Sequence, residues 1–122
     1  MQMLGSYRKM AEHELLEYRE SLAYIKGYEA SKREGTDGRR YLRRVEWTGA
    51  IEDAWEMIES NDSEKAKFFT QYYGLESPRR GKLKYAIVKL SMEYCVSITT
   101  LYRWREQVLD LVIVMAARRG LM

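Results

Sequence analysis

Proline occurs only once in the 122-residue sequence, at Pro78. Because proline removes a backbone donor and interrupts helices, a chain with a single proline can carry long, unbroken helices. Residues of high helix propensity dominate the remainder, and apolar residues recur three and four apart. The sequence therefore predicts an all-α protein.

The first thirty residues carry a narrow apolar stripe between charged positions. After the first gap its members follow in steps of three and four: Leu4, Ala11, Leu15, Tyr18, Leu22 and Ile25. A narrow stripe on a long helix usually packs against another helix, of the same chain or of a second copy. We expect one helix from Gly5 to Ala30 that either forms a homodimer or clamps the C-terminal helix.

Residues 31–44 form a basic connection. The segment from Ser31 to Gly38 holds two glycines and almost nothing apolar, which predicts a mobile linker. Four arginines then open the next helix, at positions 39, 40, 43 and 44. Cations are unfavourable at the positive N-terminus of a helix, so an anionic partner or the acidic middle segment must compensate them.

Two further helices are expected before Pro78. The first carries an apolar face made of Trp47, Ile51, Ala54, Trp55 and Ile58. Asn61, Asp62 and Ser63 should end it and cap the next helix, and Gly74 should close that one as a left-handed cap. The apolar side of this shorter helix is aromatic, with Phe68, Phe69, Tyr72 and Tyr73.

Charge is distributed unevenly along the chain. Residues 45–77 carry two basic and eight acidic groups, whereas residues 78–122 carry nine basic and three acidic groups. The stretch from Ser77 to Met92 has no acidic residue and five cations: Arg79, Arg80, Lys82, Lys84 and Lys89. Such a surface suits phosphate groups, although many charge runs are simply solvated.

The segment from Lys84 to Met115 has the pattern of a helix-turn-helix. A first helix over residues 84–94 precedes a tight break at Cys95 and Val96, and Ser97 can then cap a second helix that starts at Ile98. Ser91, Val96 and Leu101 lie five apart, as in helix pairs that approach closely at a turn. Beyond the turn, residues 108–115 are apolar on more than one side, so this helix needs several packing partners.

The outward face of the second helix offers groups that suit the major groove of DNA. We expect four residues to read bases: Thr99, Thr100, Tyr102 and Arg103. We expect seven residues to contact phosphates: Arg79, Arg80, Lys82, Lys84, Lys89, Ser97 and Arg105.

The run from Leu90 to Arg105 resembles the C-terminal helix-turn-helix of the ArpU and RinA families of phage transcription regulators, which itself resembles the promoter-reading region of sigma factors. The segment Glu14-Leu-Leu-Glu-Tyr18 is similar to the N-terminal signature of these families, and residues 68–73 match their aromatic segment. Ser91 and Cys95 depart from the alanine and glycine that are common there. The resemblance implies a sequence-specific DNA-binding transcriptional activator of phage or prophage late genes, with RNA polymerase as a further partner.

These patterns divide the chain into residues 1–30 as an N-terminal helix, 31–44 as a basic linker and helix start, and 45–122 as a helical domain with a helix-turn-helix at 84–119. We expect no enzyme, cofactor or metal site. A single cysteine excludes a cysteine-built zinc site, and His13 lies among glutamates on an exposed helix. Four acidic residues could hold magnesium, but their pattern is more typical of a solvated helix face: Glu52, Asp53, Glu56 and Glu59. Cys95 is expected to be a buried thiol, and the protein to be cytoplasmic without a membrane segment.

Two other functions fit the same pattern. A phage terminase small subunit also combines a helix-turn-helix with helical oligomerisation, and would assemble as a ring. A helical protein-interaction module would use the basic third of the chain to bind an acidic protein instead of double-stranded DNA.

Overall fold

The computed structural model describes residues 2–31, 38–77 and 81–122, with the backbone alone for residues 2–4. Within these ranges it contains helices and no strand, so the predicted all-α class is confirmed. The helices are α1 (Gln2–Leu16), α2 (Tyr18–Ser31), α3 (Gly38–Asn61), α4 (Ser63–Tyr73), α5 (Leu83–Tyr94) and α6 (Ile98–Arg118). The linker predicted after Ser31 lies outside the described residues.

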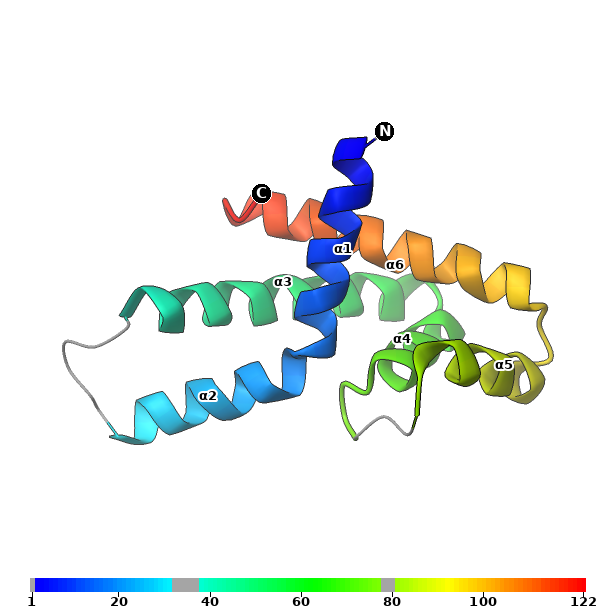
Figure 1. Ribbon diagram of the computed structural model, residues 1–122, viewed down its shortest axis with the longest axis horizontal. Helices are drawn as coiled ribbons and strands as arrows, with labels where there is room; N and C mark the ends of the chain where they lie inside the picture. The colour runs from blue at the N-terminus through cyan, green and yellow to red at the C-terminus, as the bar shows by residue number, and fades with distance from the viewer. Residues whose placement is uncertain (1, 32–37, 78–80) are drawn as a thin grey trace.

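Helices α3 and α6 pack against each other and run in opposite directions along the long axis (Figure 1). Helix α2 packs on α3, and α1 crosses α6 at a steep angle (Figure 1). Helices α4 and α5 lie at the end where α6 begins, so the turn between α5 and α6 is at one extremity of the molecule (Figure 1). The C-terminal end of α6 lies toward the other extremity, where α3 begins.

The helix predicted from Gly5 to Ala30 is divided in two, because the chain bends at Glu17 and continues as α2 in another direction (Figure 1). Backbone hydrogen bonds continue across the bend, from Glu17 N to His13 O (3.1 Å) and from Ser21 N to Glu17 O (2.8 Å). The bend lets α1 pack on α6 and α2 pack on α3, which a straight helix could not do. Beyond it Ser21 is buried, whereas Leu22 of the predicted stripe is 39% exposed.

The helix ends in the middle of the chain follow the predicted capping signals. Helix α3 ends at Asn61, and the Asp62 side chain accepts a hydrogen bond from Lys65 N at 3.1 Å to cap α4. Gly74 closes α4 in the left-handed conformation, with φ 65° and ψ 44°. Both predictions are confirmed, because short polar side chains and glycine satisfy the free backbone groups of helix ends.

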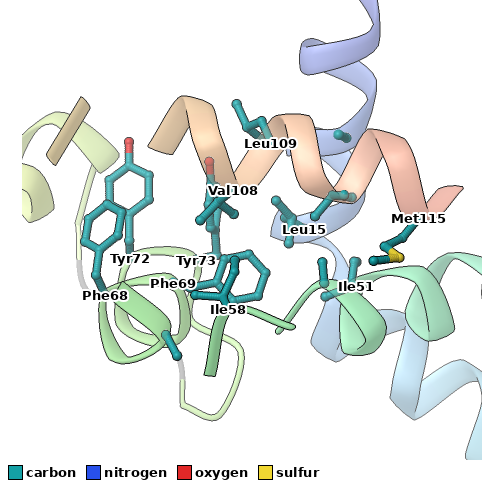
Figure 2. Packing of buried hydrophobic residues seen from close by; sticks show 14 of the residues in the cluster. Leu15, Ile51, Ile58, Phe68, Phe69, Tyr72, Tyr73, Val108, Leu109 and Met115 are labelled. Atoms are coloured by element: carbon teal, nitrogen blue, oxygen red, sulfur yellow. The ribbon is translucent and has the colours of Figure 1, made fainter. Parts of the chain in front are cut away.

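The core lies between α6 above and α3 and α4 below, with Leu15 of α1 entering from the side (Figure 2). The predicted aromatic side of α4 is buried in it, including Phe69 and Tyr73 beneath Val108 (Figure 2). The buried residues of α6 lie on more than one of its sides, as predicted: Leu101, Val108, Leu109, Val112, Met115 and Ala116. This helix contacts α1, α3, α4 and α5, and it is therefore the element around which the others assemble.

The C-terminal end of α6 is fastened to the acidic side of α3. Arg119 donates to Asp53 through Nη2 at 2.9 Å and to Glu46 through Nη1 at 3.3 Å. Its guanidinium lies directly over Gly49, where an added Cβ would be only 2.5 Å from Nη1. Part of the acidic segment therefore balances Arg119 and not, as one expectation had it, the arginines at 39–44.

This arrangement predicts an unusual response to Gly49→Ala. Alanine is favoured over glycine inside a helix by about 1 kcal/mol, but its methyl group would displace Arg119 and cost ion pairs of about 0.2–1 kcal/mol each. We expect the free energy of unfolding in urea to change little in the wild-type background. In an Arg119→Ala background the same substitution should stabilise the protein by about 1 kcal/mol. Equal effects in both backgrounds would contradict the packing of Arg119 on Gly49.

Candidate nucleic-acid interface

A three-residue turn joins α5 to α6. Cys95 closes α5 in the left-handed conformation, with φ 55° and ψ 40°, where glycine would be unstrained; the cysteine costs roughly 1 kcal/mol. Its backbone N–H donates to Met92 O, and Val96 N donates to Ser91 O at 3.2 Å. The expectation of a buried thiol is wrong, because the turn projects from the helix ends and leaves Cys95 exposed.

Ser97 caps α6 as predicted. Its backbone is extended, with φ −69° and ψ 153°, and its hydroxyl accepts a hydrogen bond from Thr100 N at 3.1 Å. The same hydroxyl lies 2.9 Å from Thr100 Oγ1. Across the turn, Leu101 is fully buried while Ser91 and Val96 are partly buried. The geometry thus fixes the direction of the first turn of α6 relative to α5.

The first two turns of α6 present polar side chains to solvent. Thr99 and Arg103 are exposed, Tyr102 is 42% exposed, and Thr100 is half-buried beside Ser97. Within the described part of the chain, Arg103 makes no hydrogen bond or ion pair. The predicted base-reading residues therefore lie together on one accessible helix end, although Thr100 shares its hydroxyl with the cap.

The predicted phosphate contacts of residues 82–89 lie on the helix that precedes the turn, with Lys82 and Lys84 at its start and Lys89 further along. Lys82, Lys84 and Lys89 are all exposed. The Lys84 ammonium lies 5.2 Å from the centre of the Tyr85 ring, and Lys89 is 4.0 Å from a carboxylate oxygen of Glu93. Arg79 and Arg80 lie outside the described residues. We call these three lysines of α5 and the exposed groups at the start of α6 the tip surface: Lys82, Lys84, Lys89, Ser97, Thr99, Tyr102 and Arg103.

Arg105 has a different role from the predicted phosphate contact. Its Nε and Nη2 donate to the two carboxylate oxygens of Glu12, each at 2.9 Å. The Tyr73 hydroxyl donates to the same carboxylate at 2.8 Å. Both members of the ion pair are largely shielded, with 28% and 20% of their side chains exposed. Arg105 therefore holds α1, α4 and α6 together, and we leave it out of the proposed interface.

Electrostatics support this structural role. Burial alone lowers the pKa of Arg105, but the hydrogen bonds to Glu12 raise it above its ordinary value. Burial raises the pKa of Tyr73, and the charge of Glu12 raises it further. Arg105 thus stays charged and Tyr73 stays a hydrogen-bond donor at neutral pH. Sequence reasoning missed the cluster because Glu12 and Arg105 are 93 positions apart.

Helix α1 also limits how much of α6 a ligand can reach. It crosses α6 beyond the tip surface (Figure 1), where Arg8 donates to both oxygens of Asp110 at 2.8 and 2.9 Å. The exposed Glu106 lies on α6 between this crossing and Arg103. A polyanion can therefore approach the first two turns of α6. Further along the helix, the charge of Glu106 and the crossing helix α1 oppose its approach.

An open groove of about 420 Å³ between α2, α3 and α4 is lined by apolar residues such as Ile51 and Trp55, with Glu52, Glu56 and Glu76. In the described ranges no three histidine, cysteine or acidic side chains gather as metal ligands. His13 is exposed, 3.6 Å from Glu17. None of the described helices is long and apolar enough to cross a membrane.

Comparisons with protein-family models, curated protein sequences and solved structures found no match to this chain. The resemblance to the ArpU and RinA families therefore stays a prediction from residues 90–105 and from the N-terminal segment.

Two arginines of α6 differ in their surroundings: Arg105 pairs with Glu12, whereas Arg103 is exposed. Arg105→Ala leaves the shielded Glu12 carboxylate without its guanidinium, so we expect a loss of about 1–3 kcal/mol in the free energy of unfolding. Arg103→Ala, two residues away on the exposed side, should change it by less than about 0.5 kcal/mol. Urea unfolding measures both variants. Equal effects would show that Arg105 does not hold the fold.

Proposed function

We propose that the protein is a sequence-specific regulator of transcription that inserts the first turns of α6 into the major groove of double-stranded DNA. The observation that carries the proposal is the exposed Arg103, which has no ion-pair partner among the described residues and lies beside Thr99 on a helix whose start is fixed by the Ser97 cap. An arginine in this position can donate two hydrogen bonds to the O6 and N7 atoms of a guanine. Thr99 can reach a base edge or a thymine methyl group.

The charges around the tip surface support this docking geometry. Lys82, Lys84 and Lys89 are exposed at and beyond the start of α5, the helix that crosses the DNA backbone in helix-turn-helix proteins. Phosphate contacts of this kind set position and affinity, while base contacts set specificity. The exposed Glu106 follows on α6 and repels phosphates, and α1 crosses α6 at Asp110, which favours entry of the helix by its N-terminal end.

The resemblance of residues 90–105 to the ArpU and RinA families supports a narrower version of the proposal. In that version the protein activates late genes of a phage or prophage in the cytoplasm of a bacterial host, in contact with RNA polymerase. Two copies would bind as a homodimer and double the DNA contacts. A ring detected by sedimentation would favour a terminase small subunit instead, and binding to an acidic protein without DNA affinity would favour an interaction module.

Arg103→Ala tests the assignment of base reading. On the duplex selected by the wild-type protein from random sequences, we expect binding to weaken by roughly 1–3 kcal/mol, with a relaxed preference at one base pair. Affinity for unrelated duplex should stay within about twofold. Arg118→Ala is the matched control, because Arg118 is an exposed arginine at the far end of the same helix.

Leu101→Ala serves as the folding control. Leu101 is fully buried beneath the tip surface, so its loss should lower the free energy of unfolding by about 2–5 kcal/mol. The helical circular dichroism of Arg103→Ala should remain that of the wild type. If Arg103→Ala weakens specific and unrelated duplexes equally, Arg103 contacts phosphate, and the base-reading assignment is wrong.

A further inference from the structure

Four arginines gather at the start of α3, at the end of the molecule opposite the tip surface. Arg39, Arg40 and Arg43 are exposed and Arg44 is half-buried. The first turn of α3 contains no acidic residue, although the positive end of a helix favours acids there and disfavours cations. Four like charges at this place therefore repel one another and the helix dipole, and a bound anion would relieve this repulsion.

No carboxylate among the described residues forms an ion pair with these four arginines. Across residues 31–44 the sequence holds six basic and two acidic residues, which leaves an excess of four positive charges. The described carboxylates nearby have other partners: Glu29 accepts from Tyr41 and Glu46 accepts from Arg119. Glu14 lies close enough for Arg43 and Arg44 to lower its pKa, but burial outweighs them and raises it.

Two of the arginines are held in place by an aromatic ring of α2. The guanidinium carbons of Arg40 and Arg44 lie 4.9 and 5.0 Å from the centre of the Tyr24 ring. Arg44 also donates to the buried Ser21 hydroxyl at 2.9 Å. A guanidinium held over a ring can still direct N–H donors to solvent, in the fork geometry that matches phosphate oxygens.

The Tyr24 ring belongs to a larger aromatic row between the two helices. Tyr24 stacks on Tyr28 with centroids 6.3 Å apart, and Tyr28 stacks on Tyr41 of α3 at 4.3 Å. The row ties α2 to α3 beneath the arginines. The guanidinium groups are thus carried on a packed support and need little ordering when an anion binds.

We propose that Arg39, Arg40, Arg43 and Arg44, supported by Tyr24, form a second phosphate-binding surface that contacts the backbone of duplex DNA. We call it the arginine surface. The inference rests on the proposed function for its choice of duplex DNA as the ligand. It adds a sequence-independent contact at a separate place, because the 21 residues of α6 put roughly 30 Å between the two ends of that helix.

The separation allows the two surfaces to be tested independently. Helix α6 begins at the tip surface, and Arg119 at its other end reaches Glu46, one helical turn or so into α3 from the arginines. A distance of roughly 30 Å is close to one turn of B-form DNA. Variants of the arginine surface should therefore change affinity for all duplexes without changing base preference.

The test measures the affinity for a mixed-sequence duplex of about three helical turns by fluorescence anisotropy over a range of KCl concentrations. The variant replaces Arg39, Arg40 and Arg43 by glutamine. We expect the slope of log K against log salt to become shallower by about 2–3 units, since each released phosphate contact contributes about 0.9. The control replaces three exposed cations elsewhere, Lys9, Arg19 and Lys67, by glutamine and matches the change in net charge.

A second pair of variants tests the support beneath the arginines without removing charge. Tyr24→Ala should weaken binding to the same duplex about three- to tenfold, because two guanidinium groups lose their stacking partner. Tyr24→Phe retains the ring and should bind like the wild type. Circular dichroism shows whether each variant keeps its helices, and Tyr24→Phe keeps the test informative if Tyr24→Ala unfolds.

The outcomes separate this inference from the proposed function. A wild-type protein that binds no duplex at all overturns both. A second outcome is that the wild type binds duplex but the slope of log K against log salt changes equally in the arginine variant and its control. The proposed role of the arginine surface is then wrong, while DNA binding by the tip surface stands. Loss of binding by Tyr24→Phe as large as by Tyr24→Ala would also overturn the role of the ring as a support.

Discussion

The Glu12 carboxylate fixes α1 against the rest of the fold, because it accepts hydrogen bonds from Arg105 of α6 and Tyr73 of α4. This one group joins the N-terminal helix to two helices that lie at least 61 positions later in the sequence. A bidentate arginine–carboxylate pair is among the strongest polar contacts when it is shielded from water. Leu15, one turn beyond Glu12, is fully buried in the same core (Figure 2).

The position of α1 has a direct consequence for function. Because Glu12 engages Arg105 and Arg8 engages Asp110, α1 is fixed across the middle of α6 and cannot cover its first two turns. The Ser97 cap and the left-handed Cys95 set the direction in which those turns leave the core. The proposed DNA-reading residues are therefore rigidly supported while remaining open to solvent, as a binding site requires.

The charges divide into satisfied and unsatisfied groups. Arg8, Arg105 and Arg119 each pair with carboxylates and hold α6 to its neighbours. Arg103 makes no ion pair among the described residues, and the arginines at the start of α3 outnumber the nearby acids. On α6, Arg105 stabilises the fold, whereas Arg103, two residues away, is exposed to solvent. Both proposals rest on the second group.

Local signals in the sequence predicted the local structure well. The helical class, the caps at Asp62, Gly74 and Ser97, and the aromatic side of α4 follow from residue spacing and helix-end chemistry, which act over a few positions. The left-handed conformation of Cys95 was not predicted, because the sequence shows only that a cysteine stands where glycine is common.

Features that depend on distant partners could not be predicted in this way. The bend at Glu17 arises because α1 and α2 pack on different helices, and the stripe alone gives no sign of it. The pairing of Arg105 with Glu12 and the contact of Arg119 with Gly49 join residues 70 or more positions apart. An exposed arginine such as Arg103 and an arginine that holds the fold, such as Arg105, look the same in the sequence until their partners are known.

The central claim is that the first turns of α6 enter a DNA groove, and amide chemical shifts of the ¹⁵N-labelled protein test it most directly. On addition of a duplex selected from random sequences, the account predicts that the largest shift changes fall on residues 97–103, with smaller changes at the start of α5. Amides of the groove between α2, α3 and α4 should not move. Changes concentrated in that groove, with residues 97–103 unaffected, would contradict the account.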